Sequence, residues 1–320
     1  MSLLGKVQSG AQPRRLRDLW YGEPGVGKTS LAAQTPAPLI VSLDDGAGAV
    51  SADKLRIGSL KELRDLLQEL RQGRHSYKTL VIDVLDEVER WIACDVAAGF
   101  KDEKGRKFNT IAEIPFAAGY KSSIDSHWRP LLADLEAFQS ATGMGLVLLA
   151  WAGEGKAPDE AGGNMIMQGP RLHDSPKVSI QGLVYGWCEN VLFLRWERAT
   201  GEGAKGTRDF REATAKQVGQ ARRVICTDSS GAWLAKNRGR GKVPSVIPMV
   251  DGDPAATWAE LAGYLLPETA QEIRRRIDCA LGSVADVELK KKVEAAVRAA
   301  GDDITQLAGV ESRLAASKRS

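Results

Sequence analysis

The amino-acid sequence predicts an α/β fold in which helices cover both faces of a mostly parallel sheet, followed by a β-hairpin extension and a small helical tail. Short apolar runs alternate with amphipathic helical patterns from Leu16 to Arg195, which is typical of parallel strands joined by crossover helices. A glycine-rich turn follows the first apolar run. The 320 residues are 43% hydrophobic and 27% charged, a composition typical of a globular chain with one α/β domain and a smaller appendage.

The strands and helices of the core are predicted from the periodicity of apolar residues. The runs that predict strands are Leu16–Tyr21, Pro38–Leu43, Thr79–Asp83, Gly145–Trp151 and Asn190–Arg195. The stretches that predict helices are Ser30–Gln34, the leucine repeat from Leu60 to Leu70, Leu85–Ala98 and Ile124–Phe138. The connections Phe100–Lys121, Ala152–Ile180 and Glu197–Gln220 are polar and glycine-bearing. We expect these three to be long loops, and loops of such length in a compact domain are often functional.

The pattern changes after Arg195. Arg222–Thr227 and Ala232–Lys236 flank a turn-forming stretch and predict a hairpin, and Ser245–Val250 predicts one further strand. Asp253 followed by a proline is a typical helix start, and from Thr269 onward apolar residues recur at helical spacing. We therefore place a domain boundary near Asp251, with a core at 1–250 and a C-terminal helical region at 251–320.

The turn after the first predicted strand has the phosphate-binding pattern of a glycine, four residues, a second glycine, lysine and threonine. In this motif glycines let successive amides point at an anion, and the following helix adds its positive end. The lysine reaches the β- and γ-phosphates of ATP, and the threonine hydroxyl binds Mg²⁺. The predicted nucleotide-binding residues are Gly22, Glu23, Pro24, Gly25, Val26, Gly27, Lys28, Thr29 and Ser30.

An acid at the end of a buried strand completes the predicted site. Asp83 follows three apolar residues, so we expect it to hold Mg²⁺ together with Thr29. The alternative is a helix cap, a role that suits Asp86 better. Hydrolysis also needs a group that activates water. We favour Asp45, because we expect its strand to lie beside the P-loop strand. Asp44 and Glu87 are the other candidates, and each of the three acids has a plain solvated alternative.

With these motifs the chain resembles the RecA-like branch of P-loop ATPases, and within it phage-encoded nucleotide-binding proteins and single-strand-annealing recombinases. The likeness rests on Gly22–Thr29, on Val41–Gly46 with its acidic end, on Val81–Asp83 and on Ala235–Gly239. It implies a RecA-like ATPase core and a homo-oligomer. Ala235–Gly239 also resembles the Lys-x-Arg element of hexameric replicative helicases and their relatives, in which the lysine and the arginine reach the neighbouring subunit's γ-phosphate. The resemblance therefore implies this role for Lys236 and Arg238. A basic hairpin facing solvent is the alternative.

The segment from Gly203 to Lys242 is strongly basic. It holds ten basic and three acidic residues, a net +7 against +3 for the whole chain, and clustered positive charge attracts nucleic-acid phosphates. In RecA-like proteins, loops in this part of the fold line the DNA channel. By that resemblance the predicted contacts with single-stranded DNA are Lys205, Arg208, Arg211 and Lys216, with Phe210 stacking on a base. A solvated loop is the alternative.

The sequence therefore predicts a Mg²⁺-dependent ATPase acting on single-stranded DNA in recombination or annealing. A P-loop kinase of a small molecule or nucleoside, and a nucleotide-switched DNA-binding or loading module with little turnover, remain open alternatives. The sequence contains no stretch typical of a signal peptide or a membrane span. We therefore expect a cytoplasmic protein that does not bind membranes. The resemblance to phage-encoded proteins implies that it is encoded by a phage and made in a bacterial host.

Overall fold

The computed structural model describes residues 15–43, 50–101, 105–158, 163–197, 221–238, 243–266, 270–282, 284 and 286–317. Within these ranges the chain forms two compact units, one comprising Arg15–Leu265 and the other beginning at Leu266. None of the helices in the described ranges combines the length and the apolar character that a membrane span requires.

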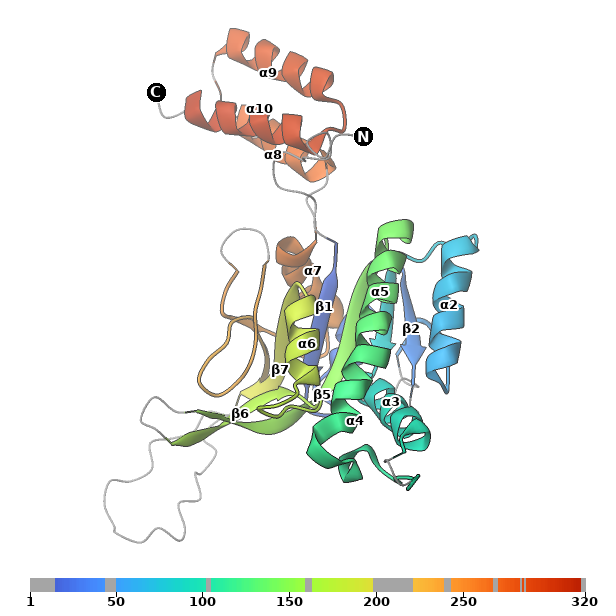
Figure 1. Cartoon of the computed structure of the whole chain (residues 1–320). Helices are drawn as coiled ribbons and strands as arrows, with labels where there is room; N and C mark the ends of the chain where they lie inside the picture. Colours follow the sequence, from blue (N-terminus) through green and yellow to red (C-terminus); the bar gives the residue numbers. More distant parts are fainter. Residues whose placement is uncertain are drawn as a thin grey trace, which may run out of the picture. The chain divides into compact units, whose positions relative to one another are not determined.

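The larger unit is built on a sheet (Figure 1), to which nine strands of the described residues belong. They are β1 (Arg17–Gly22), β2 (Pro38–Ser42), β3 (Asp53–Arg56), β4 (Thr79–Asp83), β5 (Gly145–Pro158), β6 (Asn164–Pro170), β7 (Asn190–Glu197), β8 (Arg222–Cys226) and β9 (Val246–Pro248). The order is β3-β2-β4-β5-β1-β7-β8-β9, with β6 paired to β5. The pairs from β3 to β7 are parallel, whereas β6, β8 and β9 join antiparallel. The predicted α/β fold with a mostly parallel sheet is confirmed.

Helices cover both faces of the sheet. Successive strand residues face opposite sides, and both sides carry apolar side chains that must be buried. The helices are α1 (Lys28–Ala32), α2 (Leu60–Gln72), α3 (Leu85–Gly99), α4 (Ala118–Ser123), α5 (Arg129–Thr142), α6 (Ile180–Trp187) and α7 (Pro254–Leu265), with short turns at Ile111–Glu113, Pro115–Ala117 and Ile124–Trp128. On β1, Leu19 and Tyr21 belong to the core that includes residues of α2, α3, α5 and α6. The intervening Trp20 lies 6.0 Å from Trp258 of α7, between ring centroids. Alternating apolar side chains thus bury both faces.

Two predictions about connections are wrong. The segment Ala152–Ile180 is not a loop, because β5 continues to Pro158 and pairs with β6 in an antiparallel ribbon. Its glycines, which suggested a loop, allow close packing: a Cβ on Gly153 would lie 3.1 Å from Arg171 Cγ. The segment Phe100–Lys121 includes the turns Ile111–Glu113 and Pro115–Ala117 and the start of α4, so it is partly helical.

The predicted hairpin of Arg222–Thr227 with Ala232–Lys236 is also wrong. Both edges of β8 are taken, by β7 on one side and β9 on the other, so no edge remains for Ala232–Lys236 to pair with. That segment makes isolated bridges instead, from Trp233 to Gln168 and from Lys236 to Val191. The antiparallel extension of the sheet therefore consists of β8 and β9, which are joined by residues 227–245.

The division between the units lies at Leu265/Leu266, downstream of the expected boundary at Asp251. Helix α7 belongs to the larger unit because its apolar face is buried there: Trp258 is 8% exposed and Leu261 is fully buried. The smaller unit contains α8 (Ala270–Gly282), α9 (Val287–Ala300) and α10 (Ile304–Ser317). Its core includes Ile273, Ile277, Val293 and Leu307, positions at the helical spacing visible in the sequence.

Candidate nucleotide-binding site

The phosphate-binding loop joins the carboxyl end of β1 to α1. Gly22 is the last residue of β1, and α1 begins at Lys28. Gly25 (φ 78°) and Gly27 (φ 105°) lie in the left-handed region that favours glycine. At Gly22 the reason for glycine is space, since an added Cβ would lie 2.2 Å from the carbonyl oxygen of Leu194 on β7. The loop therefore has the backbone shape that the motif predicts.

The side chains of Lys28 and Thr29 point into the region enclosed by the loop and β4. Lys28 is 6% exposed, and its Nζ donates to the carbonyl oxygens of Gly22 at 2.9 Å and Glu23 at 3.0 Å. The Thr29 hydroxyl donates to Asp83 Oδ2 at 2.8 Å, and Asp83 is 4% exposed. The structure thus brings together the ammonium, the hydroxyl and the carboxylate that the sequence singled out. These hydroxyl and carboxylate oxygens are the hard ligands that Mg²⁺ prefers, so the residues fit a Mg²⁺ site.

The strand order corrects one premise about the water-activating acid. β2 is not beside β1, because β5 and β4 lie between them. The end of β2 instead lies beside Asp83: Ser42 is its register partner, and Leu43 donates its N–H to the Asp83 carbonyl at 2.7 Å. Asp44 and Asp45 lie outside the described residues.

Two further acids follow Asp83 at the start of α3. Glu87 Oε2 accepts from Arg90 Nε at 2.7 Å. Asp86 does not cap the helix, whose N-cap is Val84. Its side chain instead accepts from the Trp151 backbone N–H at 3.0 Å and from Arg171 Nε at 2.8 Å. Burial raises the pKa of Asp86, while these hydrogen bonds and the Arg171 charge act against the rise. Asp86 therefore ties α3 to the middle of β5, at Trp151.

A small pocket adjoins the loop at the start of α1. Its volume is about 220 Å³, and it is lined by Gly27, Ser30, Arg223, Met249, Val250, Gly252 and Pro254. Arg223 is held there by Asp251, whose Oδ1 accepts from Arg223 Nη2 at 2.9 Å. The sequence pointed to Ser30, but it did not show that residues beyond β9 return to the loop. No local motif could have shown it, because the contact depends on the order β1-β7-β8-β9.

Lys236 and Arg238 lie at the amino-terminal end of β7, whereas the phosphate-binding loop follows the carboxyl end of the neighbouring strand β1. The Arg238 backbone N–H donates to Asn190 Oδ1 at 2.8 Å, and Asn190 begins β7. Arg238 Nη1 also lies 3.1 Å from Glu189 Oε2, with the Arg238 side chain 51% exposed. Lys236 Nζ donates to the Tyr185 carbonyl, and it lies 4.6 Å from the centroid of the Tyr185 ring. Burial lowers the pKa of Lys236. Within one chain, Lys236 and Arg238 therefore do not lie in the phosphate-binding site with Lys28.

The predicted DNA contacts fall in residues 198–220, outside the described ranges. They are Lys205, Arg208, Phe210, Arg211 and Lys216. Their role stays a prediction.

Comparison with known proteins identifies a family. A family model described as "AAA domain" matches residues 14–239, well over half of the chain. No curated protein matches. The crystal structure of the RadB recombinase is similar at 16% identity, covering 70% of this chain and 83% of that chain with a TM-score of 0.36. A KaiC-like protein, PH0186, from the hyperthermophilic archaeon Pyrococcus horikoshii OT3 is similar at 13% identity, covering 76% and 97% with a TM-score of 0.38. The matched family range includes the phosphate-binding loop, Asp83 and Arg238.

Proposed function

Since the chain belongs to the AAA domain family, we propose that it is a Mg²⁺-dependent ATPase that assembles with copies of itself and acts on single-stranded DNA in recombination or annealing. The observation that carries the ATPase assignment is the contact of Thr29 with Asp83, at 2.8 Å, beside the buried Lys28. A hydroxyl, a carboxylate and an ammonium meet there at the start of a helix, which is the set of groups that P-loop NTPases use on a nucleotide triphosphate.

In this site each side chain has a distinct task. The loop amides and the Lys28 ammonium bind the phosphate oxygens, with Lys28 exchanging its carbonyl partners for the β- and γ-phosphates. Thr29 and Asp83 provide the oxygens that hold Mg²⁺. When bound, the ion neutralises charge on the phosphates. The nucleoside lies toward the pocket of Met249 and Arg223, since this pocket begins at Gly27 and Ser30.

We assign activation of water to Asp45. Its support is that β2 ends beside the Mg²⁺-binding acid, since Ser42 is the register partner of Asp83 and Asp45 follows Ser42 by three residues in the sequence. Asp44 is the neighbouring alternative. Glu87 is the weaker candidate, because its carboxylate is bound by Arg90. Replacing Asp45 with asparagine should abolish hydrolysis and leave ATP binding intact. Activity retained in that variant and lost in Asp44→Asn would move the role to Asp44.

We assign Lys236 and Arg238 to the γ-phosphate of a neighbouring subunit. Their position at the amino edge of the sheet, away from the loop at the carboxyl edge, argues against action on their own chain's nucleotide. A mixture of Arg238→Ala and Asp83→Ala proteins should recover part of the activity, because some interfaces then pair an intact loop with an intact arginine. Absence of any recovery, where subunit exchange is demonstrated, would contradict this assignment.

The function is tested by measuring ATP hydrolysis with and without single-stranded DNA. We expect stimulation by DNA, and a loss of about 100-fold or more in Lys28→Ala, because one charged donor to the transferring phosphoryl is removed. Lys61→Ala is the control, since Lys61 is exposed on α2 and pairs with Asp65. Phosphate transfer to a small acceptor would support a kinase instead. Tight ATP binding without turnover would support a nucleotide-switched module.

A further inference from the structure

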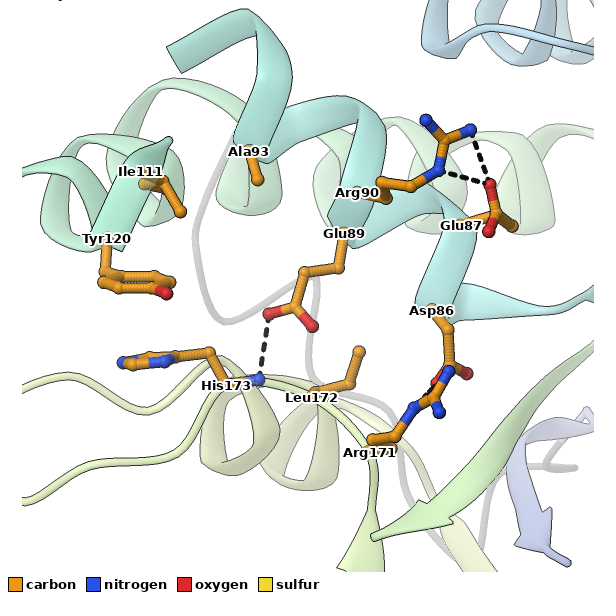
Figure 2. A pocket seen from close by; sticks show the side chains of 10 residues that line it. All are labelled: Asp86, Glu87, Glu89, Arg90, Ala93, Ile111, Tyr120, Arg171, Leu172 and His173. Atoms are coloured by element: carbon orange, nitrogen blue, oxygen red, sulfur yellow. Dashed lines mark hydrogen bonds and ion pairs between the residues drawn. The ribbon is translucent and has the colours of Figure 1, made fainter. Parts of the chain in front are cut away.

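A second, larger pocket is partly lined by the acids that follow Asp83 on α3. Its volume is about 490 Å³, within the range of about 300–1,000 Å³ typical of small-molecule sites. It is lined by Asp86, Glu87, Glu89, Arg90, Ala93, Ile111, Tyr120, Arg171, Leu172 and His173. Figure 2 shows Glu89 of α3, Tyr120 of α4, and Leu172 and His173 of the segment after β6 around one space, with Arg90 turned toward Glu87 and Arg171 toward Asp86. The pocket shares no lining residue with the phosphate-binding loop.

Glu89 supplies a hydrogen-bond acceptor inside this pocket. One carboxylate oxygen accepts from the His173 backbone N–H at 2.9 Å, and Figure 2 shows the carboxylate directed into the space between α3 and the His173 segment. Burial raises the pKa of Glu89 to about 7. The oxygen that His173 does not engage is available to a donor on a guest molecule.

Aromatic and apolar groups form the pocket's other walls. The rings of Tyr120 and His173 stack with centroids 3.5 Å apart and planes 8° from parallel. His173 Nε2 is buried and has no hydrogen-bond partner within the described part of the chain. Ala93, Ile111 and Leu172 add apolar surface. A flat, partly polar ring system suits such walls, because aromatic rings contact one another favourably edge-to-face as well as stacked.

Two arginines stand at the rim. The side chains of Arg90 and Arg171 are 60% and 54% exposed, and each neutralises one acid: Arg90 pairs with Glu87, and Arg171 pairs with Asp86. A guanidinium has five N–H donors in a planar fork, and it readily binds a phosphate through two of them. Arg171 binds Asp86 through Nε, so its terminal N–H groups can donate to an anionic group at the rim, while the interior suits a hydrogen-bond donor.

We propose that this pocket binds one nucleotide unit, with the base beside Glu89 and the phosphate at Arg90 and Arg171. A carboxylate selects bases that offer an exocyclic amino group, of which cytosine N4 is the usual partner. The unit can come from a free nucleotide or from single-stranded nucleic acid. A small zwitterion would satisfy the same charges, but it would leave most of the volume and the aromatic wall without contacts. The proposal goes beyond the ATP site and does not depend on hydrolysis.

A chain of contacts connects this pocket to the proposed ATP site. Arg171 binds Asp86, which in turn accepts from the Trp151 N–H. Trp151 is the register partner of Gly22, the first residue of the phosphate-binding loop. A phosphate that draws Arg171 from Asp86 thus changes the charge balance three residues along the chain from Asp83.

The test measures binding of cytidine and uridine 5′-monophosphates, and of oligodeoxycytidylate and oligothymidylate, by calorimetry or anisotropy. Lys28→Ala is the background, so that the phosphate-binding loop does not contribute. A buffer near pH 8 keeps Glu89 ionised, and we expect cytosine ligands to bind about tenfold more tightly than uracil or thymine ligands, the effect of about one net hydrogen bond.

Glu89→Gln is the decisive variant. Its amide oxygen stays on the His173 N–H, so its NH₂ group faces the pocket and favours the O4 acceptor of uracil or thymine. The base preference should therefore reverse. Tyr120→Leu should weaken binding of all the ligands, Tyr120→Phe should restore it, and exposed Lys177→Ala should have no effect.

Tight binding of the monophosphates would identify a free-nucleotide site, and binding of the oligonucleotides alone would identify a strand site. Binding that is absent, or unchanged by both Glu89→Gln and Tyr120→Leu in folded protein, would overturn the proposal. Failure of ATP hydrolysis would leave it standing, because the measurement contains no ATP.

Discussion

Arg171 and Asp86 form an ion pair in which one partner is exposed and the other is not. Arg171 Nε lies 2.8 Å from Asp86 Oδ1, with side-chain exposures of 54% and 6%. The Arg171 guanidinium carbon also lies 4.2 Å from the centroid of the Trp151 ring. The pair therefore covers a nearly buried carboxylate and packs against an indole at the same time, a combination that a lysine cannot reproduce.

Replacing Arg171 with alanine should lower the unfolding free energy by about 1–2 kcal/mol, because Asp86 keeps one donor but loses its charge partner. Arg171→Lys should recover less than half of the loss, since it lacks the planar contact with Trp151. Denaturant titration measures both. The control is Arg129→Ala, whose pair with Asp125 joins two exposed side chains at 3.4 Å and should contribute little. Equal losses at the two sites would contradict this account.

Replacing Gly22 with alanine should distort the phosphate-binding loop. The added Cβ would lie 2.2 Å from a backbone oxygen of β7, and a strand in the middle of a sheet cannot retreat without breaking its pairing with β1. We expect a loss of about 1–3 kcal/mol in stability, as for other overpacked sites, together with loss of ATP binding.

Two other glycines serve as controls for this substitution. Gly58 has open space around its Cβ position, so Gly58→Ala should stay within about 0.5 kcal/mol. Gly25 also has open space but has φ +78°, so Gly25→Ala should cost about 1 kcal/mol from backbone strain alone. Thermal or denaturant unfolding distinguishes the three variants. A Gly22→Ala protein that binds ATP normally would show that β7 can yield.

The sequence was informative wherever a single segment determines its own environment. Local residue spacing was enough to predict three segments, and the structure has each of them: the loop from Gly22 to Thr29, the buried strand ending in Asp83 and the helix with the leucine repeat, α2. Errors arose where pairing is decided by distant strands. Ala232–Lys236 has a strand-like composition, but β7 and β9 occupy both edges of β8.

The contacts that complete the sites are of this second kind. Met249 reaches Gly27, and His173 reaches Glu89, only because of the order in which the strands are arranged. Glu89 itself gave no signal, since an acid on an amphipathic helix is ordinarily solvated. Burial of its carboxylate results from the packing of α3 against the segment after β6, a contact between residues 84 positions apart in the sequence.

Met249→Ala should weaken ATP binding with less effect on turnover. Met249 lines the pocket next to Gly27 and Ser30, where contacts act on bound substrate and transition state alike, so the loss should be in KM rather than kcat. Removing the side chain's apolar surface should raise KM about tenfold. Val246→Ala is the matched control. Val246 is the first residue of β9, which Met249 directly follows, and it is 38% exposed but does not line the pocket. A KM unchanged in Met249→Ala would place the nucleoside elsewhere.

Asp18 should make the stability of the protein depend on pH. It is fully buried on β1, where its carboxylate accepts from Asn190 Nδ2 at 2.8 Å and from Trp20 Nε1 at 3.3 Å. Burial is the larger influence, and it raises the pKa of Asp18 from 3.8 to about 7. The folded state therefore holds the proton more tightly than the unfolded state does. The stability that results is fully present below pH 3.8, and it is lost progressively until the pH has passed about 7.

A shift of this size corresponds to a loss on the order of 4 kcal/mol in unfolding free energy across that interval. Asp18→Asn removes the titrating group, so the unfolding free energy of this variant should fall less steeply with pH than that of the wild type. Its absolute stability can still be lower, because the new NH₂ group faces another donor, Trp20 Nε1. Denaturant titrations at several pH values between the two limits give both slopes. Asp65→Asn, an exposed partner of Lys61, should retain the wild-type slope. Parallel slopes for Asp18→Asn and wild type would show that Asp18 is ionised in the folded protein at neutral pH, with Asn190 and Trp20 compensating its burial.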